Sequence, residues 1–276
     1  MSTILDQLAD YARYRVEKAK EKKPLEEIRE EALAASRQTA PGPGTSAPDF
    51  REPFRFEKAL AADGDLHFIC ECKKASPSKG LIAPDFPYLE IARQYEEAGA
   101  SAISVLTEPK WFLGSPEYLR EIAEEVKVPC LRKDFTVDPY MIYEAKLLGA
   151  SAILLICAIL DTGTLEEYLE AADSLGLSAI VEAHDETEVA SAVSAGARII
   201  GVNNRNLKDF TVDIHNSIRL RSCAPAETIF VAESGIRTLE DVETLRQNGV
   251  NAVLIGEQLM RAGSPKEELN RLRGLT

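Results

Sequence analysis

The sequence predicts an α/β fold, a (β/α)₈ barrel with an N-terminal helical extension. Three observations lead to this prediction. A repeated pattern of helix, glycine and short apolar run begins at about residue 66. Polar residues follow nearly every apolar run of that pattern. The chain has 276 residues, which is enough for one barrel of this class, at about 250 residues, and a short additional segment.

The repeated unit is a helical segment that ends in glycine and leads into a β-branched run. Glycine past a helix end adopts the left-handed conformation that closes the helix. A short, continuously apolar run is typical of a parallel strand buried on both faces. Five copies begin at Gly99, Gly149, Gly176, Gly196 and Gly249. The two long intervals between copies leave room for one more strand each, at Val128–Lys133 and Thr228–Ala232. With His67–Cys72, before the first copy, this makes eight strands.

Helices are expected between these strands, and their alternation decides the fold class. The expected ranges are 86–98, 116–126, 138–148, 164–175, 185–195, 213–222 and 238–248, with a short helix after 256. Eight alternating units favour a closed barrel. The alternative is an open doubly wound sheet, which would have about five to seven strands and a glycine-rich motif after the first. Neither GxGxxG nor GxxxxGK[ST] occurs, so that alternative is less favoured.

The N-terminal part differs from the repeats. Residues 1–50 are predicted to form a helical extension and linker, and residues 51–276 the barrel domain. The first 38 residues are highly charged, with one apolar stripe that we expect to pack on the barrel: Ile4, Leu5, Leu8, Ala9 and Tyr11. The stretch 40–48, APGPGTSAP, holds more proline and glycine than a helix or strand tolerates, and reads as a connector.

Composition limits the partners and the compartment. There are 45 acidic and 32 basic residues, a net charge of −13, which disfavours nucleic acid but not a small anion bound locally. Five cysteines form no CxxC pair, as expected for reduced thiols in a cytoplasmic protein. The longest apolar run, Ala152–Leu160, is too short to span a membrane, and the N-terminus lacks a signal-peptide core. No nucleic-acid or membrane partner is therefore expected.

Polar residues at the predicted strand ends indicate an active site, because barrel enzymes place their chemistry at the C-terminal ends of the strands. Six of them, from five strands, are expected to face the mouth: Glu71, Lys73, Lys133, Glu182, Asn203 and Glu233. Strand alternation puts Glu71 and Lys73 on one face and Cys70 and Cys72 on the other. If the charged pair points into the mouth, the cysteines pack under the helices. Singly, each charge is typical of a solvated rim; together they must pair with one another or with a ligand. Such clusters shift pKa values, as acid–base catalysis requires.

The loops after the strands add features of an anion site. Loop 74–80 has hydroxyls, lysines and a glycine, and is either an ordinary turn or a mobile lid. Ser234–Gly235 and Gly256 are expected to join strand ends to helix N-termini, where free N–H groups bind phosphate. No metal is expected, because no ligand spacing connects the three histidines, His67, His184 and His215. His184, near the mouth, is expected to lie on the rim or to bond to a loop.

Seven motifs follow one another along the chain. They are ECKKASPS from Glu71, SVLTE from Ser104 with FLGS from Phe112, LRKDF from Leu131, VEAH from Val181, GVNNRNL from Gly201, AESGI from Ala232 and LIG from Leu254. In this order they resemble the indole-3-glycerol phosphate synthase family, over residues 4 to 261 and including the helical extension. The resemblance implies ring closure of a phosphorylated small molecule, 1-(2-carboxyphenylamino)-1-deoxyribulose 5-phosphate. Carbon dioxide and water are lost, in tryptophan biosynthesis, with no metal or organic cofactor.

The resemblance also implies roles for the residues that match the motifs. Lys133 would be the general acid that protonates the substrate carbonyl as the aromatic carbon attacks it. Lys73 would pair with the carboxylate that leaves as CO₂, or act as a second acid. Glu71 and Glu182 are both candidates for the proton transfers of dehydration.

The remaining matched residues would bind the substrate. Glu233 and Asn203 would orient the amine and the ribulosyl hydroxyls. Arg205 would hold Asn203 and Glu182 or contact the substrate. Groups at the phosphate would be Ser76, Ser234, Gly235 and Gly256. The aromatic ring would lie against Phe112, Leu131 and Pro77.

Two alternatives remain at this point. The first is another phosphate-binding barrel, either similar to phosphoribosylanthranilate isomerase or a Schiff-base aldolase in which Lys133 attacks as a neutral amine. The second is a catalytically silent barrel that acts as a binding subunit. The oligomeric state is expected to be a monomer or a weak homo-oligomer.

Overall fold

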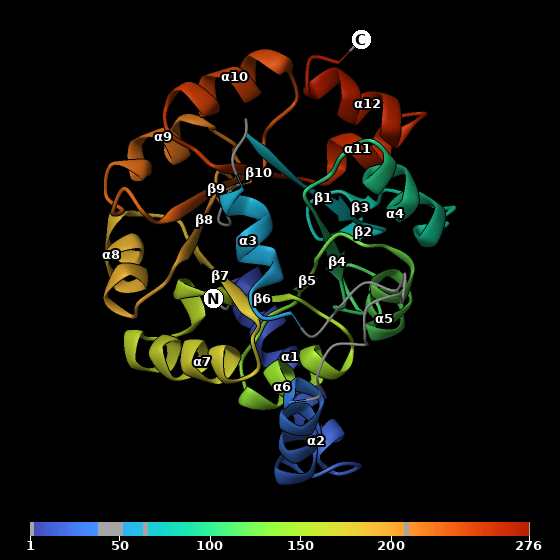
Figure 1. Cartoon of the computed structure of the whole chain (residues 1–276), viewed down its shortest axis with the longest axis vertical. Helices are drawn as coiled ribbons and strands as arrows, with labels where there is room; N and C mark the ends of the chain where they lie inside the picture. The colour runs from blue at the N-terminus through green and yellow to red at the C-terminus, as the bar shows by residue number, and fades with distance from the viewer. Residues whose placement is uncertain (1–2, 38–51, 63–65, 207–209, 276) are drawn as a thin grey trace.

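The computed structural model describes residues 3–37, 52–62, 66–206 and 210–275. Its centre is a closed barrel with the strand order β1-β10-β9-β8-β7-β6-β5-β4, surrounded by helices (Figure 1). Every neighbouring pair in the barrel is parallel. The predicted fold class is therefore confirmed. No helix in these four ranges has the length and apolar content needed to cross a membrane.

All eight predicted strands are present. They are β1 (His67–Cys72), β4 (Ala102–Leu106), β5 (Cys130–Lys133), β6 (Ala152–Ile156), β7 (Ser178–Ala183), β8 (Ile199–Asn203), β9 (Ile229–Glu233) and β10 (Ala252–Ile255). The third predicted strand begins two residues late, because Pro129 has no N–H to donate to a ladder. The loop predicted as a turn or a lid forms a short hairpin of β2 (Ala75–Ser76) and β3 (Gly80–Leu81).

The predicted helices also form, with ends within two residues of the expected ones. They are α4 (Tyr88–Glu97), α5 (Pro116–Glu125), α6 (Pro139–Leu147), α7 (Thr162–Ser174), α8 (Glu186–Ser194), α9 (His215–Arg221), α10 (Leu239–Gln247) and α11 (Glu257–Arg261). Aspartates begin three of them: the side chains of Asp138, Asp161 and Asp185 accept hydrogen bonds from first-turn N–H groups. A 3₁₀ turn, η1 (Cys157–Ile159), precedes α7. The last helix, α12 (Pro265–Leu272), was not predicted.

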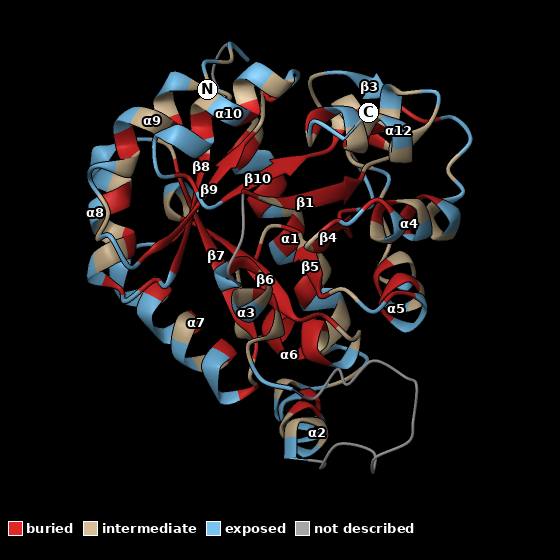
Figure 2. Ribbon diagram, turned by 45° about the horizontal axis from the view of Figure 1, so that its top comes forward, coloured by how far each residue is buried: buried red, intermediate tan, exposed pale blue. Residues whose placement is uncertain are grey.

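The buried residues form two layers, one inside the barrel and one between strands and helices. Figure 2 shows the strands as buried and the outer faces of the helices as exposed. An unpredicted helix, α3 (Arg55–Ala61), lies across the N-terminal end of the barrel (Figure 1). Its Phe56 and Leu60 are buried among inner residues such as Ile69 and Val231. The bottom of the barrel is thereby closed, and the opposite end carries the site.

The N-terminal extension consists of two helices, α1 (Ile4–Lys20) and α2 (Leu25–Arg37), separated at Pro24. The predicted stripe packs inward: Leu5, Leu8 and Ala9 are buried, and Ala12 and Val16 continue it. Helix α1 contacts α6 and η1, and α2 packs on α6. The predicted connector at 40–48 lies outside the described residues.

Candidate active site

A cavity of about 430 Å³ lies at the C-terminal ends of the strands. This is the size of a pocket for a small metabolite. All but one of the residues predicted for the site line it: Glu71, Lys73, Ser76, Phe112, Lys133, Glu182, Asn203, Arg205, Glu233, Ser234, Gly235 and Gly256. The exception is Leu131, which is fully buried in the inner core. The same alternation that brings Lys133 to the cavity leaves Leu131 one layer below it.

Lys133 lies between two buried carboxylates at the centre of the cavity. Its Nζ is 3.2 Å from Glu182 Oε2 and 3.1 Å from Glu233 Oε2. Burial alone would lower the pKa of Lys133, but the charges of Glu233 and Glu182 outweigh it and raise that pKa above its ordinary value. Lys133 is therefore an ammonium ion at neutral pH.

The two carboxylates beside Lys133 have different environments. Burial raises the pKa of Glu233 to about 7, in spite of the charge of Lys133, and the neighbouring charge of Glu182 adds to the rise. Burial acts on Glu182 as well, but Lys133 and then His184 outweigh it and lower the pKa of Glu182. The pair therefore divides into an ionised carboxylate and one that holds a proton near pH 7, as acid–base chemistry requires.

Glu71 and Lys73 form a second charged pair in the cavity. The distance from Lys73 Nζ to Glu71 Oε1 is 2.5 Å, and Ser104 Oγ donates to Glu71 Oε2 at 3.1 Å. Burial would raise the pKa of Glu71, but the ammonium groups of Lys73 and Lys133 lower it. The predicted faces of β1 are confirmed, since Cys70 and Cys72 are buried in the outer layer.

Two glycines leave room for these carboxylates. A Cβ on Gly256 would lie 2.7 Å from Glu71 Oε1, and one on Gly201 would collide with the carboxylate of Glu233. Gly201 had no predicted role beyond its place in a motif. A glycine inside an otherwise apolar strand is a signal for close approach of another group.

Ser234 and Gly235 turn the chain sharply after β9. Both are left-handed, with φ of 70° and 86°, and a Cβ on Gly235 would collide with Val212. The prediction that this turn leads into a free helix N-terminus is wrong. Helix α10 starts only at Leu239, and Thr238 with Asp241 caps its first turn. By contrast, Gly256 is the N-cap of α11, and no side chain of the described residues caps that helix.

Arg205 acts on Asn203 through its backbone. Its N–H donates to Asn203 Oδ1 at 3.0 Å, and the Asn203 amide donates to Glu182 Oε1 at 3.4 Å. The guanidinium is 3.7 Å from Glu257 Oε2, at the end of the cavity where α11 begins. Arg205 was predicted either to hold Asn203 and Glu182 or to contact the substrate. The first contact is present, but the backbone N–H of Arg205 makes it and not the guanidinium.

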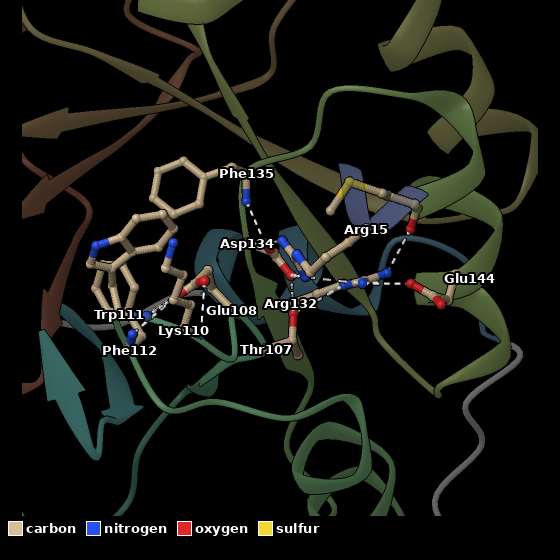
Figure 3. A network of polar contacts seen from close by, with 11 residues as sticks. Arg15, Thr107, Glu108, Lys110, Trp111, Phe112, Arg132, Asp134, Phe135 and Glu144 are labelled. Atoms are coloured by element: carbon tan, nitrogen blue, oxygen red, sulfur yellow. Dashed lines mark hydrogen bonds and ion pairs between the residues drawn. The ribbon is translucent and has the colours of Figure 1, made fainter. Parts of the chain in front are cut away.

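The N-terminal extension forms part of the cavity wall. Ile4, Leu5 and Leu8 of α1 line the cavity directly. A buried ion pair holds this helix in place: Arg15 donates to both carboxylate oxygens of Asp134, at 3.0 and 2.6 Å (Figure 3). Burial would raise the pKa of Asp134, but Arg15 outweighs it and lowers that pKa. The extension is thereby tied to the residue that follows Lys133.

A buried carboxylate organises the loop after β4. Glu108 accepts hydrogen bonds from the backbone N–H groups of Lys110, Trp111 and Phe112, at 2.9, 2.8 and 2.9 Å (Figure 3). The Trp111 ring meets the Tyr11 ring of α1 edge-on, with centroids 5.5 Å apart. In the sequence, Glu108 had no predicted role beyond its place in the motif SVLTE. In the structure it sets the loop that brings Phe112 into the cavity wall.

The comparisons with known proteins agree with this geometry. A family model described as indole-3-glycerol phosphate synthase matches residues 5–272. The chain belongs to the indole-3-glycerol phosphate synthase family. A relative of that name from Ruminiclostridium cellulolyticum is 56% identical over 271 residues, which cover 98% of this chain and 99% of the relative. One from Endomicrobium trichonymphae is 52% identical, with 98% and 99% covered.

The family settles the activity predicted from the motifs. The reaction is the ring closure that yields indole-3-glycerol phosphate, with decarboxylation and dehydration, in tryptophan biosynthesis. The substrate is a phosphorylated small molecule. Both the predicted activity and the predicted class, a carboxy-lyase, are confirmed.

Solved structures support the fold at low sequence identity. 3-Hexulose-6-phosphate synthase from Salmonella typhimurium has a TM-score of 0.63 at 15% identity, covering 76% of this chain and 98% of that one. A mutant tryptophan synthase alpha-subunit from Pyrococcus furiosus has a TM-score of 0.57 at 16% identity, covering 77% and 98%. These likenesses concern the barrel alone.

The raised pKa of Glu233 predicts a measurable dependence of stability on pH. That pKa is about 7 in the folded protein and about 4.3 in an unfolded chain. The contribution of this group to the free energy of unfolding is full below about pH 4.3 and is lost as the pH rises to about 7. We expect Glu233→Gln to lose less stability than the parent over this interval, in urea titrations at about pH 4.5 and 7. The exposed Glu227→Gln serves as control, and equal losses in the parent and Glu233→Gln would contradict the assignment.

Proposed function

We propose that Lys133 is the general acid and Glu182 the base of the ring-closing reaction. The observation that supports this is the position of Lys133, within 3.2 Å of Glu182 and 3.1 Å of Glu233. A firmly cationic lysine gives a proton to the carbonyl oxygen when the aromatic carbon attacks. An ionised carboxylate beside it then takes the proton that the ring-closed adduct loses. Lys73, free once the carboxylate has departed as CO₂, gives a proton to the hydroxyl, which leaves as water.

We place the leaving carboxylate at the other charged pair. Lys73 would hold the anthranilate carboxylate until it departs as CO₂. Glu71 holds Lys73 in position, and Ser104 in turn donates a hydrogen bond to Glu71. Glu233 and Asn203 would then orient the amine and the ribulosyl hydroxyls. In this proposal Glu71 has no base role, because its carboxylate is engaged by Lys73 and Ser104.

We place the phosphate at the end of the cavity where β9 and β10 finish. Ser76, Ser234, Gly235 and Gly256 all line the cavity, and the strands that lead to them, β1, β9 and β10, are neighbours in the barrel. The N–H groups of the left-handed turn and of the first turn of α11 are the natural donors to an anion. The aromatic ring would lie against Phe112 and Pro77, with Leu8 of α1 in the place expected of Leu131.

A Schiff-base mechanism is disfavoured by the same geometry. An aldolase lysine must be neutral to attack a carbonyl, and the two carboxylates favour the ammonium form of Lys133. Borohydride treatment with substrate bound tests this. We expect no covalent adduct on Lys133, and a trapped adduct would overturn the general-acid role. A catalytically silent barrel that only binds a partner is also disfavoured. It would have no need for five charged side chains at the mouth, each within ion-pair distance of another.

The roles of the two glutamates are tested by separating CO₂ release from indole formation. In the Glu182→Gln variant we expect indole formation to fall by about 10²–10⁴-fold, because a base is lost. In single-turnover experiments CO₂ should still appear first, since the base acts after decarboxylation. The Glu71→Gln variant should instead lose CO₂ release and indole formation together. A Glu182→Gln variant with full turnover would contradict the assignment.

We also propose that the enzyme works as a monomer or weak homo-oligomer in the cytoplasm, without nucleic acid or membrane. All five cysteines are free thiols, which supports a reducing compartment. The division into residues 1–50 and 51–276 remains part of this proposal.

A further inference from the structure

His184 follows directly after β7 and lies between two carboxylates. Its Nδ1 is 3.1 Å from Glu188 Oε2, and its backbone N–H donates to the same oxygen at 2.8 Å. Its Nε2 is 3.5 Å from Glu182 Oε1. The side chain is 19% exposed. The imidazole therefore connects α8 to the carboxylate that faces Lys133.

The ring nitrogen that faces Glu182 is poorly satisfied. His184 Nε2 is buried and makes no hydrogen bond within the described chain, and the same holds for Glu233 Oε1. Glu182 by contrast has neighbours on both oxygens: Asn203 and His184 at Oε1, and Lys133 at Oε2. The proton donors of this part of the site thus gather around Glu182.

We propose that His184 is a positioning residue for Glu182. Held as an imidazolium by Glu188, it orients Glu182 and stabilises its ionised form, so that the proton shared by the two central carboxylates resides on Glu233. This inference rests on the proposed function, in which Glu182 is the base.

The groups that face His184 favour the imidazolium. Glu182 lies on β7, the strand that His184 follows, Glu188 on α8 and Glu233 on β9. Lys133 contacts the other oxygen of Glu182. Burial lowers the pKa of His184, but the hydrogen bond to Glu188 and the charge of Glu182 outweigh it and raise that pKa above its ordinary value of 6.5.

The other elements packed here contribute neutral contacts. From α9, the Asn216 amide donates to the His184 carbonyl at 3.3 Å. From η1, the Cys157 thiol donates to the Glu188 carbonyl at 3.4 Å. Burial raises the pKa of Cys157 to about 12, so this thiol brings no negative charge near neutral pH.

NMR titration of the imidazole groups tests the electrostatic part without measuring turnover. The chain has three histidines, so each signal can be assigned by substitution. We expect His184 to titrate above about 6.5, and its pKa to fall in Glu182→Gln and in Glu188→Gln. Asp213→Asn is the matched control, because Asp213 contacts the exposed His215 at 3.0 Å and should leave the His184 signal unchanged.

The pH profile of kcat tests the positioning part. Without the imidazolium, Glu182 is protonated more readily, so the acid limb of kcat should move to higher pH in His184→Gln. We expect kcat to fall by about tenfold near pH 6, much less above about pH 8, and KM to stay nearly constant. Glu188→Gln should shift the limb in the same direction by a smaller amount, which provides a second test if His184→Gln fails to fold. His215→Gln should keep the parent profile.

Several outcomes would overturn the inference. They are a His184 pKa at or below about 6.5, a His184 pKa that Glu182→Gln does not change, and a kcat in His184→Gln that is unchanged or reduced equally at every pH. Failure of the proposed function would appear elsewhere, as full turnover in Glu182→Gln. An inactive Glu182→Gln variant with an unchanged His184 titration would overturn the inference alone.

Discussion

Lys133→Met is expected to lower kcat by about 10²–10⁴-fold, because it removes the proton donor and keeps the length of the side chain. It also leaves Glu182 and Glu233 facing each other without a cation. Like charges this close disfavour double ionisation, so the pair should take up a proton and remain folded. The substrate keeps its contacts to Lys73 and to the phosphate end of the cavity, so its Kd should change by no more than about tenfold.

The measurement is indole formation under saturating substrate, together with substrate binding by calorimetry. Lys266→Met is the control, because Lys266 is also ion-paired, with Glu97 at 2.8 Å, but lies on α12 and on the exposed surface. It should retain the turnover of the parent. Unchanged turnover in Lys133→Met would exclude Lys133 as the acid. A loss of binding comparable to the loss of kcat would assign Lys133 to substrate binding instead.

Arg15→Met is expected to lower the free energy of unfolding by about 3 kcal/mol. The side chain of Asp134 is completely buried, and Arg15 makes two of its hydrogen bonds. Thr107 donates to Asp134 at 2.6 Å and Arg132 lies at 3.8 Å, so part of the charge remains compensated. The loss should therefore stay at the lower end of the range for a broken buried pair.

A comparison of the free energies of unfolding of Arg15→Met and Lys20→Met, measured in urea, isolates the effect of burying the ion pair. Lys20 also ties α1 to the barrel, through Asp138 at 2.6 Å, but its side chain is 27% exposed and that of Asp138 23%. Removing such a partly exposed pair should cost less than about 1 kcal/mol. Equal losses in the two variants would contradict the role assigned to Asp134.

The pH dependence of the Arg15→Met loss gives an additional check. The folded-state pKa of Asp134 is lowered, so the stabilisation by the pair is full above the unfolded pKa of about 3.9 and is lost as the pH falls through the folded one. The difference between the parent and Arg15→Met should thus be constant near neutral pH and shrink in acid. A difference that grew on acidification would contradict the ion pair.

Local patterns predicted most of the fold. Strand alternation depends only on the backbone, so the shared face of Glu71 and Lys73, opposite to that of Cys70 and Cys72, followed from their spacing alone. In five of the repeats, the glycine after the helix marked where the next strand begins. Because parallel strands in a closed barrel end at one rim, the polar residues that follow them could be assigned to one cavity before any distance was known.

Other features lacked a local signal. Helix α3 is a short charged segment. Its apolar residues are buried only because they cover the open end of the barrel, which the local sequence does not show. The position of Leu131 depends on how deep the cavity floor lies. The start of α10 depends on its cap at Thr238, which sets the helix apart from the turn at Ser234.

By itself, the sequence determined the (β/α)₈ barrel, the charged residues at its mouth and, through its motifs, the family and its reaction. Only the tertiary structure decided that α1 walls the cavity, that Arg15 pairs with Asp134, 119 positions away, and that His184 stands beside Glu182. The physical reason is range. Hydrophobic periodicity, and the glycines and prolines that end helices and strands, depend on residues a few positions apart, so they can be recognised in the sequence. A buried ion pair or a shared proton depends on which distant segments meet and on how much water they exclude.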